Sequence, residues 1–289
     1  MTTGAAFRFP GTWQLTSGIC MSHLRSIELR DIPEGAEKAF PFTVPIIRAL
    51  GRLELGQPVT FLVGENGSGK STLLEGIAAA AKLPTVGSQS IDRDETLTAQ
   101  RLLASSLSFV WNRKVKRGFF LRAEDFFGFT KELSKMRAEM LARLAEIEIE
   151  YAGRSRQAYG LARMTFVNSL ADMERRYGVN LDENSHGQSF LKLFQNRFVP
   201  GGLYLLDEPE APLSPQSQLA LLAMIGDMVQ QDAQFIIATH SPILLGAANA
   251  VIYNCDSVPI QRAEYEALDH VAITKDFLNN RDRYLRHLS

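Results

Sequence analysis

The stretch Gly64-Glu65-Asn66-Gly67-Ser68-Gly69-Lys70-Ser71, followed by Thr72, decides how the rest of this chain is interpreted. It has the pattern G-x-x-x-x-G-K-S, in which glycines let the backbone wrap closely around a phosphate group. Successive N–H groups of such a loop point at one anion, and the helix that follows adds the positive end of its dipole. The residue types predict that Lys70 reaches the β- and γ-phosphates of ATP and that the Ser71 hydroxyl binds Mg²⁺.

The sequence on both sides of this loop supports the interpretation. Pro58 to Val63 is a short apolar run typical of a buried strand. Leu73 to Lys82 is rich in Ala and Leu and predicts a helix that Pro84 stops. A Gly-rich turn that binds nothing is the alternative, and this context makes it less favourable. The order strand, loop, helix therefore predicts an α/β core that binds a nucleotide at the end of a strand.

A second apolar run, Leu203 to Leu206, ends in Asp207 and Glu208. A strand that is apolar at successive positions is typical of a parallel sheet covered on both faces, where ligands bind at the carboxyl ends of the strands. The two carboxylates are therefore expected to face the same crevice as Lys70. Asp207 is suited to hold Mg²⁺ through water and Glu208 to polarise the attacking water. Two acids here also fit a helix cap, but the upstream loop favours the catalytic role.

Two further segments carry weaker signals on their own. Phe235 to Ala238 predicts another buried strand, and His240 just past its end can reach a γ-phosphate, although a lone histidine is more often structural. Ser185-His186-Gly187-Gln188 precedes the helix-like run 191–198. A hydroxyl and free N–H groups at a helix start present another anion site, which the sequence alone does not identify further.

Composition bounds the class of protein. The 289 residues carry a formal net charge of −1, which gives no global case for nucleic-acid binding. The one dense basic run, Arg113-Lys114-Val115-Lys116-Arg117, either contacts phosphates or is a solvated face. Only Cys20 and Cys255 are present, without metal-ligand spacing, as in a reducing compartment. No apolar run approaches the ~18 residues of a membrane span, and residues 1–20 lack a secretory pattern, so we expect a cytoplasmic protein.

The N-terminal part mixes loop and strand. Residues 1–21 are rich in Gly, Thr and Ser and predict a flexible arm. Leu24 to Leu29 alternates apolar and polar residues, as in a half-exposed strand, and 31–45 with its prolines is expected to be mostly loop. Phe40 and Phe42 lie in that loop. We interpret them as core aromatics, and stacking of one of them on adenine is the alternative.

The middle of the chain is mostly helical in its pattern. A helix is expected over 102–111. The segment Gly118 to Phe127 is expected to start as a buried strand, and it includes the acids Glu124 and Asp125. Apolar residues recur at three- and four-residue spacings over 131–151, and 157–177 resumes as a second, weaker helix. These two helices predict an antiparallel pair that projects from the core and is too short for an extended coiled coil.

The expected division follows from these elements. Residues 22–99 and 200–289 form a nucleotide-binding core, and 100–199 form an inserted helical subdomain that carries the second anion site.

Taken in order, these segments resemble the ATP-binding cassette (ABC) ATPases. Residues 64–72 are similar to the family's Walker A loop, 203–208 to Walker B with its catalytic Glu, and 185–189 to its Leu-Ser-Gly-Gly-Gln signature. Ala211-Pro212-Leu213-Ser214 resembles the D-loop and Thr239-His240-Ser241 the switch histidine. The match covers residues 24 to about 250.

Within that family, the chain looks most like stand-alone predicted ATPases related to the DNA-repair and chromosome-maintenance branch. The tail, with Asp276-Phe277-Leu278 and Arg283-Tyr284-Leu285, adds to this likeness. The resemblance implies a P-loop fold with a mostly parallel central sheet, Mg²⁺ and ATP as ligands, and two protomers that close head to tail. Ser185, Gly187 and Gln188 of one protomer would contact the γ-phosphate bound by Lys70 of the other.

Two residues depart from the family's pattern. His186 stands where the signature usually has Gly, and no Gln occupies an obvious Q-loop, because the strand with family-like spacing ends in Glu124-Asp125 while Gln89 and Gln100 come early. The leading function is an ATP-hydrolysing switch that dimerises on ATP and whose helical segment engages a partner, with nucleic acid as one candidate. The alternatives are the ATP-binding subunit of a membrane transporter and a nucleotide-gated binding module, and Glu208 argues against the last.

Overall fold

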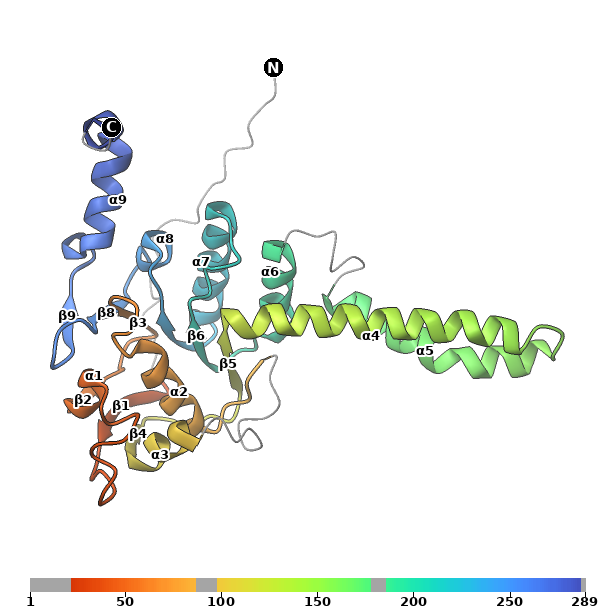
Figure 1. The fold of residues 1–289 in the computed structure, drawn as a ribbon, viewed down its shortest axis with the longest axis horizontal. Helices are drawn as coiled ribbons and strands as arrows, with labels where there is room; N and C mark the ends of the chain where they lie inside the picture. Colours follow the sequence, from red (N-terminus) through yellow and green to blue (C-terminus); the bar gives the residue numbers. More distant parts are fainter. Residues whose placement is uncertain (1–21, 87–97, 178–185, 287–289) are drawn as a thin grey trace.

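A computed structural model describes residues 22–86, 98–177 and 186–286 of the chain. Three predicted features lie outside the described residues: the flexible N-terminal segment 1–21, Gln89 and Ser185. A six-stranded sheet in the order β5-β6-β7-β3-β8-β9 forms the centre, and a three-stranded sheet in the order β2-β1-β4 packs nearby (Figure 1). The central strands are β3 (Val59–Val63), β5 (Gly118–Arg122), β6 (Leu203–Asp207), β7 (Gln234–Ala238), β8 (Val251–Asn254) and β9 (Gln261–Ala263).

The central sheet is parallel from β5 to β8, and only β9 runs antiparallel to its neighbour. The smaller sheet is antiparallel and consists of β1 (Leu24–Leu29), β2 (Arg52–Glu54) and β4 (Leu107–Trp111). This mixed, mostly parallel α/β architecture confirms the predicted fold class. The apolar runs before Gly64 and before Glu208 form β3 and β6 of this one sheet, and β7 lies between them.

Both faces of the central sheet are buried, which explains the continuous apolar runs. In β3, Val59, Phe61 and Val63 enter one hydrophobic core, whereas Leu62 enters the other. Alternate residues of a strand point to opposite faces, so a sheet covered on both sides needs apolar residues at every position. The first core packs against α6 (His186–Arg197), α7 (Pro215–Val229), α8 (Pro242–Leu245) and the base of α9 (Asp269–Asn279). The second packs against α1 (Pro45–Arg48), α2 (Lys70–Ala81) and α3 (Thr98–Ser106).

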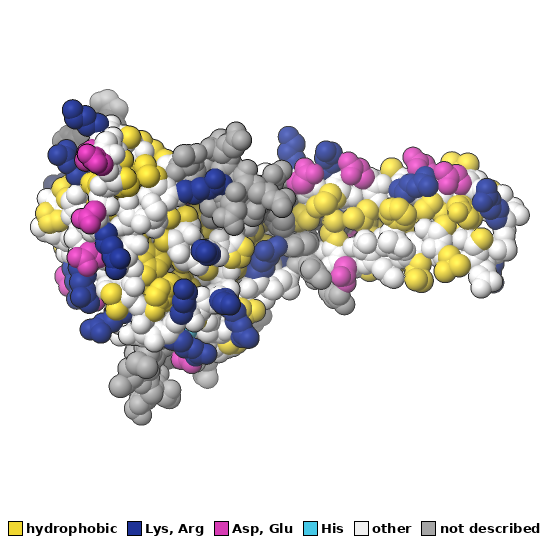
Figure 2. Space-filling model, turned by 90° about the horizontal axis from the view of Figure 1, so that it is seen from below, with side chains coloured by type: hydrophobic (Ala, Val, Ile, Leu, Met, Phe, Trp, Pro, Cys, Tyr) yellow, Lys and Arg dark blue, Asp and Glu magenta, His cyan; other side chains and the backbone are white. Residues whose placement is uncertain are grey.

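An antiparallel helical pair projects far from this core, as the sequence predicts (Figure 1). It consists of α4 (Ala123–Glu150), with 28 residues, and α5 (Arg156–Tyr177), with 22. Leu133 and Met173 are buried between the two helices, and Arg137 forms an ion pair of 3.4 Å with Glu174. Figure 2 shows apolar side chains along the visible face of this arm and charged side chains along its edge. We call α4 and α5 the arm.

The structure corrects the helix expected over 102–111. The helix α3 ends at Ser106, and β4 continues from Leu107 to Trp111 as an antiparallel partner of β1. Phe109, Val110 and Trp111 are aromatic or β-branched, so they favour an extended backbone once a partner strand is present. Leu102 and Leu103 alone carry the helical signal.

The expected division at residue 100 also differs from the structure. Both β4 and β5 lie in sheets, so the part that leaves the core begins at Ala123 and returns after Tyr177. The chain ends with a 3₁₀ turn (Tyr265–Ala267), α9 and the short α10 (Arg281–Leu285). Among the described residues, no helix is both long enough and apolar enough to cross a membrane.

Candidate nucleotide-binding site

The loop between β3 and α2 has the backbone that its glycines predict. Gly69 has a φ of 100°, and a Cβ atom there would lie 2.5 Å from Cγ1 of Val44, so no other residue fits. The helix α2 begins at Lys70, and no side chain caps its first turn. Its first N–H groups are therefore free for an anion, as at other phosphate-binding helix starts.

Lys70 is nearly fully buried and closes this loop on itself. Its Nζ donates hydrogen bonds to the carbonyl oxygens of Gly64, at 2.6 Å, and Glu65, at 2.9 Å. The N–H of Glu65 in turn donates to a carboxylate oxygen of Asp256 at 2.8 Å. Asp256 follows β8, so the neighbouring strand braces the loop from outside. The ammonium group is held at the loop and needs only to exchange acceptors to bind a phosphate.

The first cavity of the site lies in front of this loop. It is lined by Phe40, Val44, Asn66, Gly67, Gly69, Lys70, Ser71, Thr72 and Glu208. The structure separates the two phenylalanines that the sequence treats together. Phe42 is fully buried in the second core, whereas the side chain of Phe40 is 52% exposed and borders the cavity. The interpretation as core aromatics therefore holds for Phe42 and not for Phe40.

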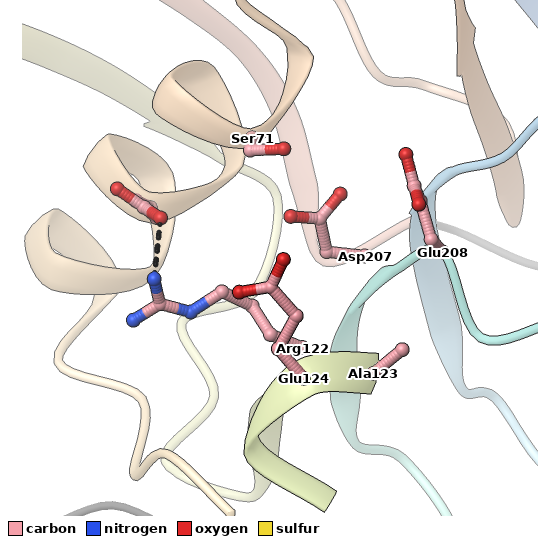
Figure 3. A pocket seen from close by; sticks show the side chains of 7 residues that line it. Ser71, Arg122, Ala123, Glu124, Asp207 and Glu208 are labelled. Atoms are coloured by element: carbon pink, nitrogen blue, oxygen red, sulfur yellow. Dashed lines mark hydrogen bonds and ion pairs between the residues drawn. The ribbon is translucent and has the colours of Figure 1, made fainter. Parts of the chain in front are cut away.

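The second cavity joins the loop to the acidic strand end. It is lined by Ser71, Glu75, Arg122, Ala123, Glu124, Asp207 and Glu208 (Figure 3). In Figure 3, Ser71 and Asp207 face each other, and Glu124 reaches in from the first turn of α4. Arg122 forms an ion pair of 2.8 Å with Glu75 of α2. Gln100 of α3 donates to the other oxygen of that carboxylate at 2.7 Å.

Asp207 is the most perturbed carboxyl group of this cavity. Burial raises its pKa to about 6, the charges of Glu208 and Glu75 push in the same direction, and the hydrogen bond from Ser71 opposes them. One carboxylate oxygen of Asp207 is shielded from solvent and has no hydrogen-bond partner among the described residues. A buried acceptor of this kind beside a serine hydroxyl fits a divalent cation, which prefers oxygen ligands and would favour the ionised form.

The turn after β6 meets the turn after β7. Asp207 lies opposite Ala238 in the parallel register, which brings Glu208 and His240 together. Nε2 of His240 is 3.7 Å from Oε1 of Glu208, and Glu208 has a φ of 49°, which is uncommon for a residue with a side chain. The backbone N–H of His240 donates to Glu210 at 2.7 Å. Glu208 thus borders both cavities, and His240 lies beside it without lining either cavity itself.

The expected signature segment lies elsewhere. Gly187 and Gln188 start α6 and line neither cavity. A Cβ atom on Gly187 would lie 3.1 Å from the carbonyl oxygen of Pro212, so this segment packs against the stretch 211–214. Gln188 is exposed at the surface. Within one copy of the described chain, the structure brings the loop, Asp207, Glu208 and His240 together and leaves the signature apart from them.

Sequence reasoning missed several residues of this site. Asp256 and His270 come from segments far along the chain with no motif of their own, and the ring of His270 on α9 lies 6.3 Å from that of His240. Arg122 and Glu210 were adjacent to recognised segments. A charge at the end of a buried strand was the available signal for Arg122, whereas Glu210 lies three residues past the end of β6.

The loop, the acidic strand end and the sheet order have the arrangement of the P-loop nucleoside triphosphatase fold. A family model described as an AAA domain matches residues 47–104. The macrolide export ATP-binding/permease protein MacB of Hahella chejuensis is 27% identical over 192 residues, which are 66% of this chain and 27% of MacB. The chain thus spans about a quarter of the length of this relative.

Two further proteins extend the comparison. The cobalt import ATP-binding protein CbiO of Salmonella typhimurium is 25% identical over 247 residues, 81% of this chain and 83% of CbiO. The Smc head domain of Pyrococcus furiosus is 11% identical, with a TM-score of 0.42, over 89% of this chain and all of that domain. The chain is thus similar to ATP-binding proteins of the ATP-binding cassette type.

Proposed function

We propose that this protein binds ATP with Mg²⁺, hydrolyses it, and works as a switch in which two copies close head to tail on the nucleotide. The observation that carries the proposal is the meeting of Lys70, Ser71, Asp207 and Glu208 around two adjoining cavities. Lys70 and Ser71 come from the first turn of α2, and Asp207 and Glu208 come from the end of β6. Together they supply an anion site, a cation site and a base. A module that binds ATP without hydrolysing it would not need this base.

The loop residues have the first role in this proposal. Gly64, Glu65, Asn66, Gly67, Ser68 and Gly69 wrap the phosphates with their backbone, followed by Lys70, Ser71 and Thr72 at the start of α2. Lys70 exchanges its two carbonyl acceptors for phosphate oxygens. Phe40, which is half exposed at the same cavity, stacks on the adenine ring.

The acidic residues have the second role. Ser71 and Asp207 hold Mg²⁺, which neutralises phosphate charge when it is bound. Glu208 orients the attacking water, and His240, 3.7 Å away, contacts the γ-phosphate side. Because Asp207 has a shielded oxygen without a partner, cation binding supplies a contact that the described part of the chain lacks.

The second copy supplies the remaining anion contacts. Ser185, Gly187 and Gln188 are the candidates, because Gly187 and Gln188 stand at a helix start outside the cavities of their own copy. A γ-phosphate held by Lys70 of one copy and by this helix start of the other would close the dimer, and its loss on hydrolysis would open it.

The arm gives this proposal its output. The helix α4 begins at the residue after β5, and Glu124 in its first turn borders the same cavity as Asp207. We therefore propose that nucleotide state reaches a macromolecular partner through the arm. The exposed basic run Arg113 to Arg117, in the β4–β5 connection, makes nucleic acid one candidate for that partner.

The alternative function is the ATP-binding subunit of a membrane transporter, and the likeness to CbiO and MacB favours it. Such a subunit would purify with a membrane protein and would gain turnover from it. The dimerising switch would instead hydrolyse ATP in the absence of a membrane protein. The long arm, which leaves the core at the edge of the cavity, favours the first function.

ATP turnover of the wild type and of Glu208→Gln, with and without DNA or RNA, tests the proposal. We expect turnover that requires Glu208, and an ATP-dependent dimer of Glu208→Gln in size-exclusion chromatography with light scattering. Lys131→Ala, an exposed lysine of the arm, is the matched control for Lys70→Ala, which should lose ATP binding. Turnover that is unchanged in Glu208→Gln, or a strictly monomeric Glu208→Gln at saturating ATP, would contradict the proposal.

A further inference from the structure

The tail of the chain stands away from the core but is anchored beside the nucleotide site. Val271 and Leu268, at the base of α9, are buried in the first core. The hydroxyl of Tyr265 donates to the carbonyl oxygen of Pro242 at 2.9 Å, and Pro242 lies two residues after His240. The ring of His270 packs edge to face with that of His240 at 6.3 Å. The base of α9 is therefore fixed to the turn that carries His240.

The outer part of α9 has no cover in this copy. Every described residue after Val271 is exposed or half-buried, and α9 stands clear of the other elements in Figure 1. The side chains of Ile273 and Leu278 are nevertheless 58% and 73% exposed, and Phe277 and Leu285 are exposed too. An isolated helix of 11 residues is marginally stable in water, so this segment gains from a surface that covers its apolar side.

The apolar side begins at the nucleotide site. His270, Ile273 and Phe277 are spaced i, i+3 and i+7, and residues at these spacings share one face of a helix. The face whose first member touches His240 thus continues outward as Ile273 and Phe277. Leu278 flanks it on the side of Val271.

The tail is also internally braced. The hydroxyl of Tyr284 and the amide of Asn280 both donate to the carboxylate of Asp276, each at 2.7 Å. Phe277 and Tyr284 pack edge to face at 5.6 Å. These contacts fold α10 back onto α9, although neither helix packs on the core there. Charged residues of both signs surround the apolar residues of this segment. Lys275 pairs with Glu266 at 3.0 Å, and the other charges are Asp269, Asp276, Arg281, Asp282, Arg283 and Arg286.

We infer that the α9–α10 tail is part of the dimer surface, and that Ile273, Phe277 and Leu278 dock on the second copy of this chain when two copies close over ATP. The inference rests on the proposed head-to-tail closure. A second copy that reaches the γ-phosphate must approach the edge where Glu208, His240 and His270 meet, and the exposed face of α9 starts at this edge.

His270 lies where the base of the tail meets His240. Burial lowers its pKa, and the nearby His240 acts in the same direction. Its Nε2 atom is shielded and has no hydrogen-bond partner among the described residues. The contact between the two rings couples the base of the tail to the residue that we propose faces the γ-phosphate.

The test uses Glu208→Gln as the background, so that bound ATP is not consumed. The dimer dissociation constant at saturating Mg²⁺-ATP is measured by light scattering and sedimentation for this background, for added Ile273→Glu and for added Ile149→Glu. Ile149 is 78% exposed on α4 near the tip of the arm, so the control makes the same substitution on another exposed helix. We expect Ile273→Glu to weaken the dimer tenfold or more and Ile149→Glu to leave it unchanged.

Two readouts separate docking from indirect effects. The affinity of a fluorescent ATP analogue, measured at protein concentrations where only monomer is present, should be equal in the three proteins. A photo-cross-linking amino acid at position 278 should join two copies when ATP is present and not when it is absent. Equal dimer constants for Ile273→Glu and Ile149→Glu, or no cross-link between copies, would overturn the inference while the ATP-dependent dimer stands. A background protein that stays monomeric would instead remove the proposed function, and the inference with it.

Discussion

The backbone N–H of His240 donates a 2.7 Å hydrogen bond to the carboxylate of Glu210, and this bond ties the turn after β7 to the turn after β6. The N–H of Glu208 donates back across the same junction to the carbonyl oxygen of Ala238 at 2.9 Å. Glu208 and His240 therefore keep a fixed separation through the backbone rather than through their own side chains. Glu210 is in this sense a positioning residue for the histidine.

Replacement of Glu210 tests that role. Glu210→Ala leaves the partly buried N–H of His240 without its acceptor, which should lower the free energy of unfolding by about 1–2 kcal/mol. We expect turnover to fall tenfold or more because His240 is no longer held beside Glu208. Glu210→Gln retains an oxygen acceptor and should recover most of both quantities. Urea denaturation and ATP turnover measure them, and an alanine variant with wild-type turnover would refute the positioning role.

The two phenylalanines before the loop should separate binding from stability. Phe40→Ala removes a half-exposed ring at the cavity and should weaken ATP binding, since base stacking contributes about 1–3 kcal/mol. Its melting temperature should be close to that of the wild type. Phe42→Ala empties a fully buried position and should cost about 3–5 kcal/mol of stability. Titration with labelled ATP and thermal denaturation check both; equal ATP affinity for Phe40→Ala and wild type would argue against stacking.

The metal-free protein should lose stability as the pH rises from about 4 to about 6, because Asp207 ionises in this range. Its pKa is raised to about 6 in the folded chain, chiefly by burial, and its usual value is 3.8. Between these values the folded state holds a proton that the unfolded state has released, so the free energy of unfolding falls with rising pH. The full loss, on the order of 3 kcal/mol, is reached above pH 6.

Asp207→Asn removes this dependence, because an amide does not titrate. In buffer with a chelator, the variant should be more stable than the wild type at pH 7.5 and similar to it at pH 4. Mg²⁺ should then stabilise the wild type at pH 7.5 and have little effect on the variant. Urea denaturation over this pH range measures the difference, and identical slopes for the two proteins would show that Asp207 has no raised pKa.

Gln234 should matter for folding and not for nucleotide binding. Its buried side-chain amide accepts from the N–H of Leu24 at 2.8 Å and donates to the carbonyl oxygens of Leu24, at 2.9 Å, and Leu55, at 2.8 Å. These bonds join β1 and the end of β2 to β7 of the central sheet. Gln234→Ala should therefore lower stability by about 2–4 kcal/mol, because several buried polar groups lose their partners.

The control for this prediction is Gln231→Ala, whose amide makes an exposed bond to the carbonyl oxygen of Asp227. It should change stability by less than about 0.5 kcal/mol. ATP affinity, measured at a temperature where both proteins are folded, should match the wild type in each case. A Gln234 variant as stable as the control would mean that the smaller sheet docks without these bonds.

Most of the fold could be predicted from the sequence, because it depends on interactions between residues that lie close together in the chain. The glycines before Lys70 predict the backbone conformation of the loop. The acids after Leu206 predict the end of a strand. Both features depend on residues only a few positions away. The apolar runs of β3, β6 and β7 follow from burial on both faces, and that pattern survives in a single sequence. The same reasoning predicts the arm, because α4 keeps one apolar stripe over its length.

The remaining features depend on residues that meet only after folding. Leu107 to Trp111 becomes a strand because β1 lies beside it, and nothing within the segment reveals that partner. Asp256 braces the phosphate-binding loop from a position 191 residues away. Sequence alone does not distinguish Phe40 from Phe42, because only the packing of the loop that contains them decides which ring enters the core.

No loop separates β5 from α4: the strand ends at Arg122, and the helix begins at Ala123. Arg122 is paired with Glu75 of α2, the helix that starts at Lys70. A rigid rod of 28 residues, about 42 Å long, is thus mounted directly on the edge of the sheet. A tilt of about 5° at its root would carry its far end through about 4 Å, so the arm can act as a lever that magnifies small changes around Lys70 and Ser71.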